Sequence, residues 1–350
     1  IKNSMDVEIL KRTPSSFLGS CRFKLPTVEK SPETYEKIIA VLRKLDIQHF
    51  FYIGGNDSMD TIKQLSEYAK AKNITDITFM GVPKTIDNDL AVTDHTPGYG
   101  SAAKYIASTM KEIIRDALVQ PIKIVNIIEI MGRNAGWLTA AAALAKGDDC
   151  EGADLIYLPE TVFDINKFVA KVQEIQKTKK QIVVAVSEGV KTADGKYVCE
   201  SASSNMLVDS FGHKQLSGTA TALANVISNE IGCKTRAIEF STIQRCASHI
   251  ASLTDVNEAF IVGGIAVKAA FDGETGKVGI FQRLSNKPYL MGTSIYDVNA
   301  IANVEKTVPQ EWIINDGTGV SQEALDYMRP LIQGEIYPYM VDGLPRHIKL

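Results

Sequence analysis

The sequence predicts an α/β protein with two doubly wound domains, each built on a mostly parallel sheet. Two observations support this fold class. Short apolar segments alternate along the chain with longer segments that place apolar residues on one helical face. Several of the apolar segments also run directly into loops that carry glycine and charged residues. In an open parallel sheet such loops lie beyond the carboxyl ends of the strands, where ligands bind.

The elements follow one another in a regular order. The first strand is the apolar run Phe50 to Ile53, and the helix after it repeats apolar residues from Met59 to Ala69 at helical spacing. The same reasoning predicts, in order, strand 50–53, helix 58–72, strand 77–82, helix 99–118, strand 123–131, helix 134–145, strand 154–158, helix 164–178 and strand 181–187. A polar stretch over 190–204 predicts a surface loop or hairpin, and helix 216–231, strand 236–240 and helix 255–270 follow it.

Composition excludes several classes of protein. A chain of 350 residues with 45% hydrophobic residues can bury a large core, and its length favours two domains. The net charge of −3 argues against nucleic acid or an anionic membrane as a partner. No apolar run approaches the roughly 20 residues needed to span a bilayer. Five scattered cysteines predict reduced thiols in a cytoplasmic protein, and none of the five histidines has a partner at metal-ligand spacing.

Three loops that follow predicted strands carry the residues of interest. The first, Gly54 to Ser58, has paired glycines before a helix start, which lets the backbone approach a phosphate group closely. The second, Pro83 to Leu90, contains a lysine and two aspartates, and the third, Glu129 to Trp137, contains an arginine matched to phosphate oxygens. Each pattern alone is also typical of a helix cap or a solvated loop. Their recurrence at three strand ends favours a phosphate-binding site.

Together these loops resemble the phosphofructokinase family. The family's donor loop reads GGDxS, its catalytic loop TIDND and its sugar-phosphate loop MGR, and the corresponding segments here are Gly54–Ser58, Thr85–Asp89 and Met131–Arg133. Further segments resemble the family in the same order along the chain: Gly19–Arg22, Thr96–Ala103, Ser187–Gly189, Thr235–Arg236 and Ile243–Arg245. The resemblance implies the phosphofructokinase fold.

Two positions distinguish the phosphoryl donor within this family. Members that use ATP have glycine before the serine of the first loop and before the threonine of the second, whereas pyrophosphate users have aspartate and lysine. This chain has Asp57 and Lys84, so the resemblance implies a pyrophosphate-dependent enzyme. The physical reason is that a carboxylate at Asp57 repels the α-phosphate of ATP, while Lys84 neutralises charge that develops on pyrophosphate.

The resemblance implies phosphoryl transfer from pyrophosphate to the 1-hydroxyl of fructose 6-phosphate, a reversible step of glycolysis that yields fructose 1,6-bisphosphate and phosphate. Asp87 is the expected general base, and Thr85 and Asp89 are expected to orient the hydroxyl. Mg²⁺ is the expected cofactor, and together with Lys84 and Arg22 it would screen the charge of the two reactants.

The expected ligands form three sets. The donor is expected at Gly55, Asn56, Asp57, Ser58 and Arg22, and the metal at Asn56, Asp57 and Asp89. The sugar phosphate is expected at Thr85, Asp87, Met131, Gly132, Arg133, Glu188, Arg236 and Arg245, with Arg133 counted among the catalytic residues. Because the family supplies the arginine at the position of Arg236 from a neighbouring subunit, a homodimer or homotetramer with a shared sugar-phosphate site is expected.

The chain departs from the family pattern at three places. Asn56 stands where most members have aspartate, and it is a weaker ligand for a hard cation. Thr242 stands where nucleotide-dependent members have a histidine that contacts the sugar phosphate. An arginine that the ATP enzymes supply across the subunit interface would fall near Ile124, where Lys123 is the nearest charged substitute.

The resemblance also predicts the domain boundaries. The family opens with a strand and a glycine-rich loop over the donor phosphates, and neither is found here, so about fifty to seventy further residues are expected ahead of Ile1. Because the chain crosses twice between the domains in this family, residues 1–98 plus 243–300 are expected to form the phosphoryl-donor domain. Residues 99–242 plus 301–350 are expected to form the sugar-phosphate domain.

Two alternative functions remain open from the sequence. One is an ATP-dependent phosphofructokinase that tolerates Asp57 and Lys84, because Asn56 relieves some negative charge. The other is a non-catalytic subunit that binds sugar phosphate and regulates a partner. Such a subunit is expected to lack its base or its phosphate clamp, and Asp87, Lys84 and Arg133 are all present.

Overall fold

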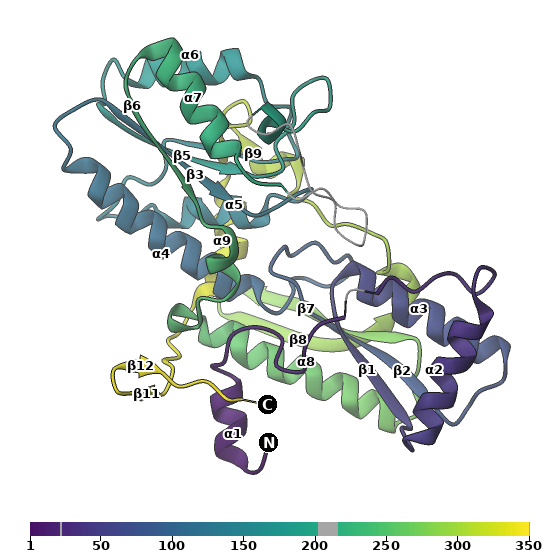
Figure 1. The fold of residues 1–350 in the computed structure, drawn as a ribbon. Helices are drawn as coiled ribbons and strands as arrows, with labels where there is room; N and C mark the ends of the chain where they lie inside the picture. The colour runs from purple at the N-terminus through teal and green to yellow at the C-terminus, as the bar shows by residue number, and fades with distance from the viewer. Residues whose placement is uncertain (22, 202–215, 350) are drawn as a thin grey trace. The chain divides into compact units, whose positions relative to one another are not determined.

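The computed structural model describes residues 1–21, 23–201 and 216–349 and divides into two compact units (Figure 1). The small unit consists of Cys21–Gly98 and Asp255–Lys306. The large unit consists of Ile1–Ser20, Tyr99–Thr254 and Thr307–Leu350. Each unit contains its own four-stranded sheet, which is wholly or mostly parallel, so the predicted fold class is confirmed.

The sheet of the small unit has the order β1-β2-β7-β8. Its strands are β1 (His49–Gly54), β2 (Thr78–Pro83), β7 (Lys277–Asn286) and β8 (Tyr289–Asp297). The first three strands are parallel, and β8 returns antiparallel to β7 as a hairpin. The short helix η5 (Val298–Ala300) follows β8. The register pairs Gly54 with Pro83, so the loops that follow β1 and β2 leave the sheet side by side.

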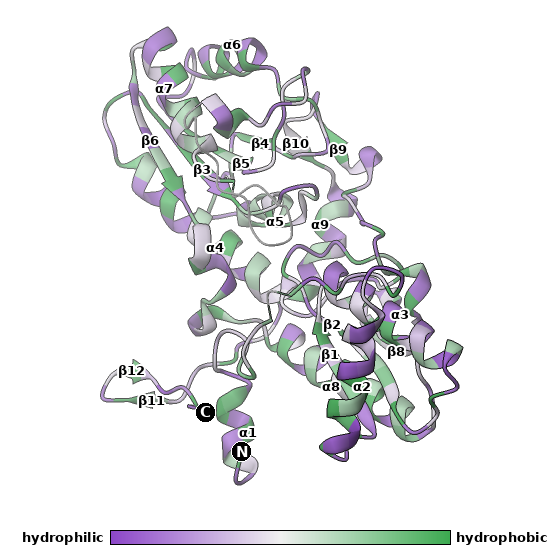
Figure 2. Cartoon of the chain, turned by 45° about the vertical axis from the view of Figure 1, so that its right-hand side comes forward, coloured by the Kyte–Doolittle hydropathy of each residue, from purple (hydrophilic) through white to green (hydrophobic). Residues whose placement is uncertain are grey.

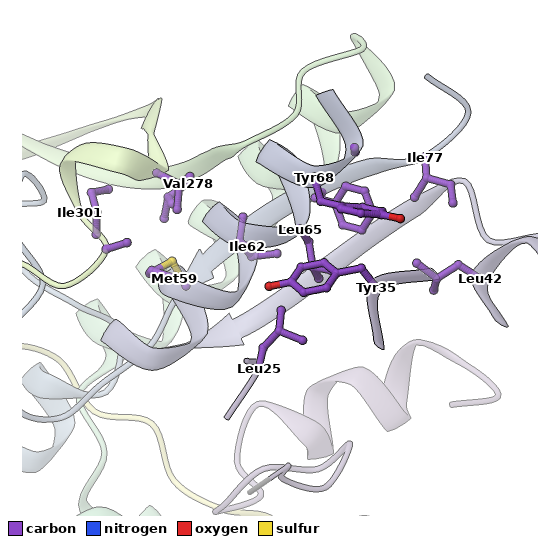
Figure 3. Packing of buried hydrophobic residues seen from close by; sticks show 14 of the residues in the cluster. Leu25, Tyr35, Leu42, Met59, Ile62, Leu65, Tyr68, Ile77, Val278 and Ile301 are labelled. Atoms are coloured by element: carbon purple, nitrogen blue, oxygen red, sulfur yellow. The ribbon is translucent and has the colours of Figure 1, made fainter. Parts of the chain in front are cut away.

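Helices cover both faces of this sheet. On one face, α2 (Pro32–Lys44) and α3 (Asn56–Ala71) form the main core of the unit with Phe79, Val278 and Ile301. Figure 3 shows this core from close by, with the rings of Tyr35 and Tyr68 at a centroid distance of 5.0 Å. Each large apolar side chain that is fully buried in this way contributes about 1.5–3 kcal/mol to folding.

The opposite face is covered by α8 (Leu253–Phe271), whose Ala269 and Ala270 pack against Met80. The small side chains allow the helix to lie close to the strands. The same helix also exposes Phe260 and Phe271, and Figure 2 shows it among the hydrophobic segments of the chain.

The sheet of the large unit is entirely parallel and has the order β4-β5-β3-β6. Its strands are β4 (Leu155–Tyr157), β5 (Gln181–Ser187), β3 (Ile124–Ile130) and β6 (Lys234–Glu239). All seven residues of β3 are buried, as expected for a central strand of a parallel sheet. One face packs against α6 (Ile165–Ile175) and α7 (Thr219–Ile231), and α4 (Tyr99–Leu118) packs against the sheet separately from them (Figure 1).

The remaining elements of the large unit are short. They are α1 (Ser4–Leu10), α5 (Trp137–Ala140), η1 (Ala141–Ala145), η2 (Val198–Ser201), η3 (Ser241–Arg245), η4 (Ser248–Ile250), η6 (Gln310–Trp312), β9 (Ile313–Ile314), β10 (Gly319–Val320), α9 (Gln322–Met328), η7 (Arg329–Ile332), β11 (Met340–Val341) and β12 (Leu344–Pro345). Among all the helices that the structure describes, none combines the length and the apolar character needed to cross a bilayer.

The two units differ from the predicted domain boundaries at three places. Residues 1–20 belong to the large unit, because Arg12 donates to the carbonyl of Tyr337 at 3.0 Å and stacks on Tyr339. Residues 243–254 also belong to the large unit, where the Ser252 hydroxyl donates to the carbonyl of Leu331 at 2.7 Å. Residues 301–306 belong to the small unit, because Lys306 is bonded to the loop after β2.

Several elements differ from the sequence prediction. The predicted helix 134–145 is only a short α5 followed by a 3-10 helix, because a loop continues through Gly136. A Cβ atom added to Gly136 would lie 2.6 Å from Glu160 Oε2 and 2.9 Å from Leu158 Cβ, so this close approach suits glycine. The sequence prediction omitted α2 and the β7–β8 hairpin altogether, whereas α4 and β5 have the predicted bounds. Part of the predicted loop 190–204 lies outside the described residues.

Candidate active site

The loop after β1 turns directly into α3. A Cβ atom added to Gly54 would lie 2.0 Å from Ser58 Oγ, so only glycine fits there without a shift of the serine. The carbonyl of Gly55 accepts the backbone N–H groups of Ser58 and Met59 at 3.0 Å, which closes the first turn of the helix. The N–H groups at the start of a helix have no acceptor within the helix, and the helix dipole favours an anion near them. This loop therefore has the geometry of a phosphate site.

The loop after β2 lies beside the first loop. The backbone N–H of Lys84 donates to the carbonyl of Gly54 at 3.0 Å. Lys84 is exposed, whereas the next residue, Thr85, is only 7% exposed. The Thr85 hydroxyl oxygen accepts the backbone N–H of Asp87 at 3.1 Å, which fixes the backbone of the candidate base. Asp57 is also exposed in the first turn of α3. The small unit thus presents one carboxylate and one ammonium group on neighbouring loops.

The carboxylate of Asp89 lies in an unusual environment. Burial raises the pKa of Asp89 to about 6, and the negative charge of the nearby Asp87 adds to the effect. Among the described residues, Asp89 Oδ1 and both amide atoms of Asn56 are buried and have no hydrogen-bond partner. Buried polar atoms without a partner are rare, and a bound ion or water can supply the contact they lack. In the described part of the chain, no three His, Cys, Asp or Glu side chains form a metal-binding cluster by themselves.

Asn88 and Lys306 form hydrogen bonds that hold the loop after β2. Asn88 is fully buried with φ of 55°, a left-handed conformation that asparagine tolerates. Its Oδ1 atom accepts the backbone N–H of Thr96 at 3.1 Å and the ammonium group of Lys306 at 3.4 Å. Burial lowers the pKa of Lys306 to about 8, although the negative charges of Asp94 and Asp89 act in the opposite direction. The sequence analysis did not identify either residue.

A second buried group at this loop is the imidazole of His95. Its two ring nitrogens lie 2.8 Å from carboxylate oxygens of Asp94 and Glu258. Arg283 donates to the same Asp94 oxygen at 2.8 Å, and Tyr289 donates to Glu258 at 2.7 Å. Burial alone would lower the pKa of His95, but the hydrogen bonds to the two carboxylates raise it above the ordinary value of 6.5. This network ties the loop after β2 to α8 and to the β7–β8 hairpin.

The loop after β3 carries the candidate sugar-phosphate residues in the large unit. Gly132 has φ of 142°, and a Cβ atom there would lie 2.6 Å from the carbonyl oxygen of Ala135. Its backbone N–H donates to Glu188 Oε1 at 3.4 Å, and its carbonyl accepts the hydroxyl of Ser187. A Cβ atom on Gly189 would lie 2.0 Å from the carbonyl oxygen of Arg133. The ends of β3 and β5 are therefore packed so tightly that Met131–Arg133 and Glu188 occupy one site.

Gln244, the residue before Arg245, connects η3 to this site. Gln244 is 2% exposed; its Oε1 atom accepts the backbone N–H of Met131 at 3.3 Å, and its Nε2 atom donates to the carbonyl of Ser241 at 3.0 Å. Arg245 follows as an exposed residue at the end of η3. Gln244 is thus the link between the arginine and the loop after β3, and the sequence analysis did not single it out.

Arg236 lies apart from this group, on the edge strand β6. Its Nη1 atom lies 3.1 Å from a carboxylate oxygen of Asp116 on α4. Two of the three departures from the family pattern are exposed side chains, namely Thr242 in η3 and Lys123 before β3, and the third is the partly buried Asn56. Arg22 lies outside the described residues.

A model of the family described as phosphofructokinase matches residues 1–241. The chain belongs to the phosphofructokinase family. The resemblance that the three loops indicated is therefore confirmed.

Several relatives that match nearly the whole chain are named after pyrophosphate as the donor. A pyrophosphate–fructose 6-phosphate 1-phosphotransferase of Halomonas elongata is 39% identical over 98% of this chain and 81% of its own length. A protein of the same name from Xanthomonas campestris is 41% identical over 98% of this chain and 82% of its own length. The crystal structure of a pyrophosphate-dependent phosphofructokinase from Nitrosospira multiformis matches with a TM-score of 0.87, at 37% identity over 99% of this chain and 82% of that one. These relatives confirm that this phosphofructokinase resembles the pyrophosphate-dependent members.

Proposed function

We propose that this phosphofructokinase transfers a phosphoryl group from pyrophosphate to the 1-hydroxyl of fructose 6-phosphate and also catalyses the reverse reaction. The products of the forward reaction are fructose 1,6-bisphosphate and phosphate, as in glycolysis. The names of the relatives support this activity. The observation that carries the choice of donor is the exposure of Asp57 and Lys84 on neighbouring loops. At these positions a carboxylate repels the α-phosphate of ATP, and an ammonium group attracts the smaller donor.

Asp87 is the proposed general base. It takes the proton of the 1-hydroxyl as the oxygen attacks the terminal phosphorus of pyrophosphate. The hydrogen bond from its backbone N–H to Thr85 Oγ1, at 3.1 Å, restricts the backbone conformation at Asp87 and so the direction from which its carboxylate can reach the hydroxyl. Lys84 neutralises the negative charge on the transferred group and on the leaving phosphate, a role that Arg22 is proposed to share.

The unpartnered oxygens of Asn56 and Asp89 fit a Mg²⁺ ion. Both are buried oxygen atoms of the kind that this cation prefers, and Asp57 offers a further carboxylate at the same helix start. When bound, Mg²⁺ supplies positive charge that screens the diphosphate. Since burial raises the pKa of Asp89 to about 6, its carboxylate is mostly ionised and able to bind a cation at pH 7 and above.

In the large unit, Met131, Gly132, Arg133, Glu188 and Arg245 are the proposed ligands of fructose 6-phosphate. The arginines bind phosphate oxygens, and Glu188 accepts sugar hydroxyls. Arg236 lies on an edge strand, where its partly exposed guanidinium can reach a second subunit. We therefore propose a homodimer or homotetramer in which Arg236 completes the sugar-phosphate site of its neighbour.

All five cysteines are free thiols in the structure. Free thiols persist in a reducing compartment. This supports a cytoplasmic location for the proposed reaction.

The test is the initial rate of fructose 1,6-bisphosphate formation by the full-length protein with Mg²⁺, measured with equal concentrations of pyrophosphate or ATP. Turnover with pyrophosphate alone supports the proposal. Turnover with ATP alone identifies an ATP-dependent enzyme and shows that Asp57 and Lys84 do not select the donor. No turnover with either donor, together with measurable binding of fructose 6-phosphate, identifies a regulatory subunit.

A further inference from the structure

Lys306 makes an unusual set of contacts with the loop that follows β2. Its backbone N–H donates to the carbonyl of Asp89 at 2.7 Å. The adjacent Glu305 forms an isolated antiparallel β-bridge with Leu90 through the backbone. Its ammonium group donates to the carbonyls of Asp94 at 2.7 Å and Thr93 at 3.1 Å. The segment after η5 thus lies against this loop as an added strand would, with the lysine side chain turned into it.

The third acceptor of the ammonium group is Asn88 Oδ1, at 3.4 Å. Asn88 separates the candidate base Asp87 from the candidate metal ligand Asp89, and it is fully buried. The same oxygen accepts the backbone N–H of Thr96, which lies in the second arm of the loop, just before α4. Lys306 and Asn88 therefore cross-link both arms of the loop at the point where the two aspartates lie.

Placing the ammonium group of the partly buried Lys306 among carbonyl oxygens is a costly way to hold a loop together. Removing an ammonium group from water costs several kcal/mol, and an apolar side chain of similar volume is often neutral or better for stability. An ammonium group makes directional contacts that an apolar side chain cannot make, because it holds three oxygens at hydrogen-bond distance. In a reaction that depends on position, a shift of about 1 Å in a catalytic group can reduce the rate about 100-fold.

We propose that Lys306 is a positioning residue for phosphoryl transfer, whose ammonium group holds Asn88 and thereby places the carboxylates of Asp87 and Asp89. The inference rests on the proposed function. Because Lys306 acts through Asn88 and the loop backbone, its loss lowers kcat and leaves the KM for both substrates nearly unchanged. A lysine that served stability alone would change the melting temperature without this pattern in the kinetics.

The experiment measures kcat and KM for pyrophosphate and for fructose 6-phosphate in the full-length enzyme with Mg²⁺. Lys306→Met, Asn88→Ala and the double variant form a double-mutant cycle. Lys306→Met is expected to lower kcat about 10- to 100-fold with each KM within about threefold of wild type. Since the two residues act through one contact, the double variant is expected to have a kcat within about threefold of that of Asn88→Ala.

Two further variants complete the design. Lys268→Met removes an exposed lysine on α8 of the same unit, paired with Asp272, and is expected to keep kcat within about twofold. If Lys306→Met does not fold, Lys306→Gln takes its place in the cycle, because its side chain is polar but shorter, is uncharged and has two N–H donors instead of three. The same kinetic pattern is expected of it.

The inference is overturned if kcat of the Lys306 variant stays within about threefold of wild type, if only KM changes, or if the effects of the two substitutions multiply. A wild-type enzyme that gives no product from pyrophosphate contradicts the proposed function instead. The two failures are therefore distinguished before any variant is measured.

Discussion

His95 Nε2 lies 2.8 Å from Glu258 Oε2, across 163 positions of sequence. This contact joins the loop after β2 to α8, and the ring also stacks on Phe281 at a centroid distance of 4.5 Å. With Asp94 on its other nitrogen, the imidazole is enclosed by two carboxylates in a site where it is 1% exposed. Both ring nitrogens of His95 are therefore within hydrogen-bond distance of carboxylates, an arrangement that favours the protonated imidazole.

The first prediction is a pH-dependent stability that depends on His95. Its pKa is raised above 6.5 in the folded state, so folding favours the protonated form. The resulting stabilisation is fully present below about pH 6.5 and is lost as the pH rises through the folded-state pKa. The pKa of Asp94 is lowered from 3.8: burial opposes this change, but the hydrogen bond to His95 and the charge of Arg283 outweigh it. Its contribution is present above about pH 3.8 and is lost on acidification.

The measurement is chemical unfolding of wild type and His95→Gln between pH 5 and pH 9. The substitution is expected to cost about 3 kcal/mol at pH 5.5, where it leaves buried carboxylates without their partner, and less as the pH rises. His249→Gln removes an exposed imidazole on η4 and serves as the control. A stability difference that is the same at every pH, or that grows above pH 7, would contradict the assignment of a charged His95.

The second prediction concerns the general base. Asp87→Asn keeps the size of the side chain but removes its ability to take a proton, so kcat is expected to fall about 1,000-fold. The KM values for pyrophosphate and fructose 6-phosphate are expected to change little. Asp272→Asn is the matched control, because it neutralises an exposed aspartate of the same unit. If Asp87→Asn retains more than about a tenth of the wild-type kcat, another group is the base.

The third prediction concerns the choice of donor. The double variant Asp57→Gly, Lys84→Gly removes the repelling carboxylate and the attracting ammonium group. Its kcat/KM for pyrophosphate is expected to fall at least about 100-fold, while turnover with ATP becomes detectable. Asp57→Asn removes the charge and keeps the size of the side chain. It therefore separates the effect of charge on donor selection from the effect of side-chain size. Unchanged use of pyrophosphate by the double variant would show that donor selection lies elsewhere.

The alternation of strands and helices could be predicted from sequence because each element is a local pattern. The bounds of α4 and β5 and the three loops are of this kind, since glycines such as Gly54 and Gly132 are set by contacts with residues a few positions away. The β7–β8 hairpin was not among the predicted strands. Its antiparallel pairing changes the edge of the sheet, not the fold class.

The residues that hold the site in place could not be predicted in the same way. Lys306 and Asn88 are 218 positions apart, and Gln244 and Met131 are 113 apart. Neither pair has a spacing or a composition that marks it in one sequence. Their role comes from burial and hydrogen bonding, which only the folded chain shows. Sequence reasoning therefore names the groups expected to touch substrate, but not the distant residues that hydrogen-bond to the loops that carry them.

The last prediction concerns Gln244, which links η3 to the loop after β3. Gln244→Leu keeps most of the volume but leaves the N–H of Met131 and the carbonyl of Ser241 without their partners. Because Arg245 is the next residue, its backbone is expected to shift, and the KM for fructose 6-phosphate is expected to rise about 10-fold. The KM for pyrophosphate and kcat are expected to remain within about twofold, since the donor residues belong to the other unit. Gln322→Leu is the control, because this exposed glutamine bonds Asp326 one helical turn away on the surface of α9. A lower melting temperature with an unchanged KM for fructose 6-phosphate would show that Gln244 stabilises the large unit without positioning Arg245.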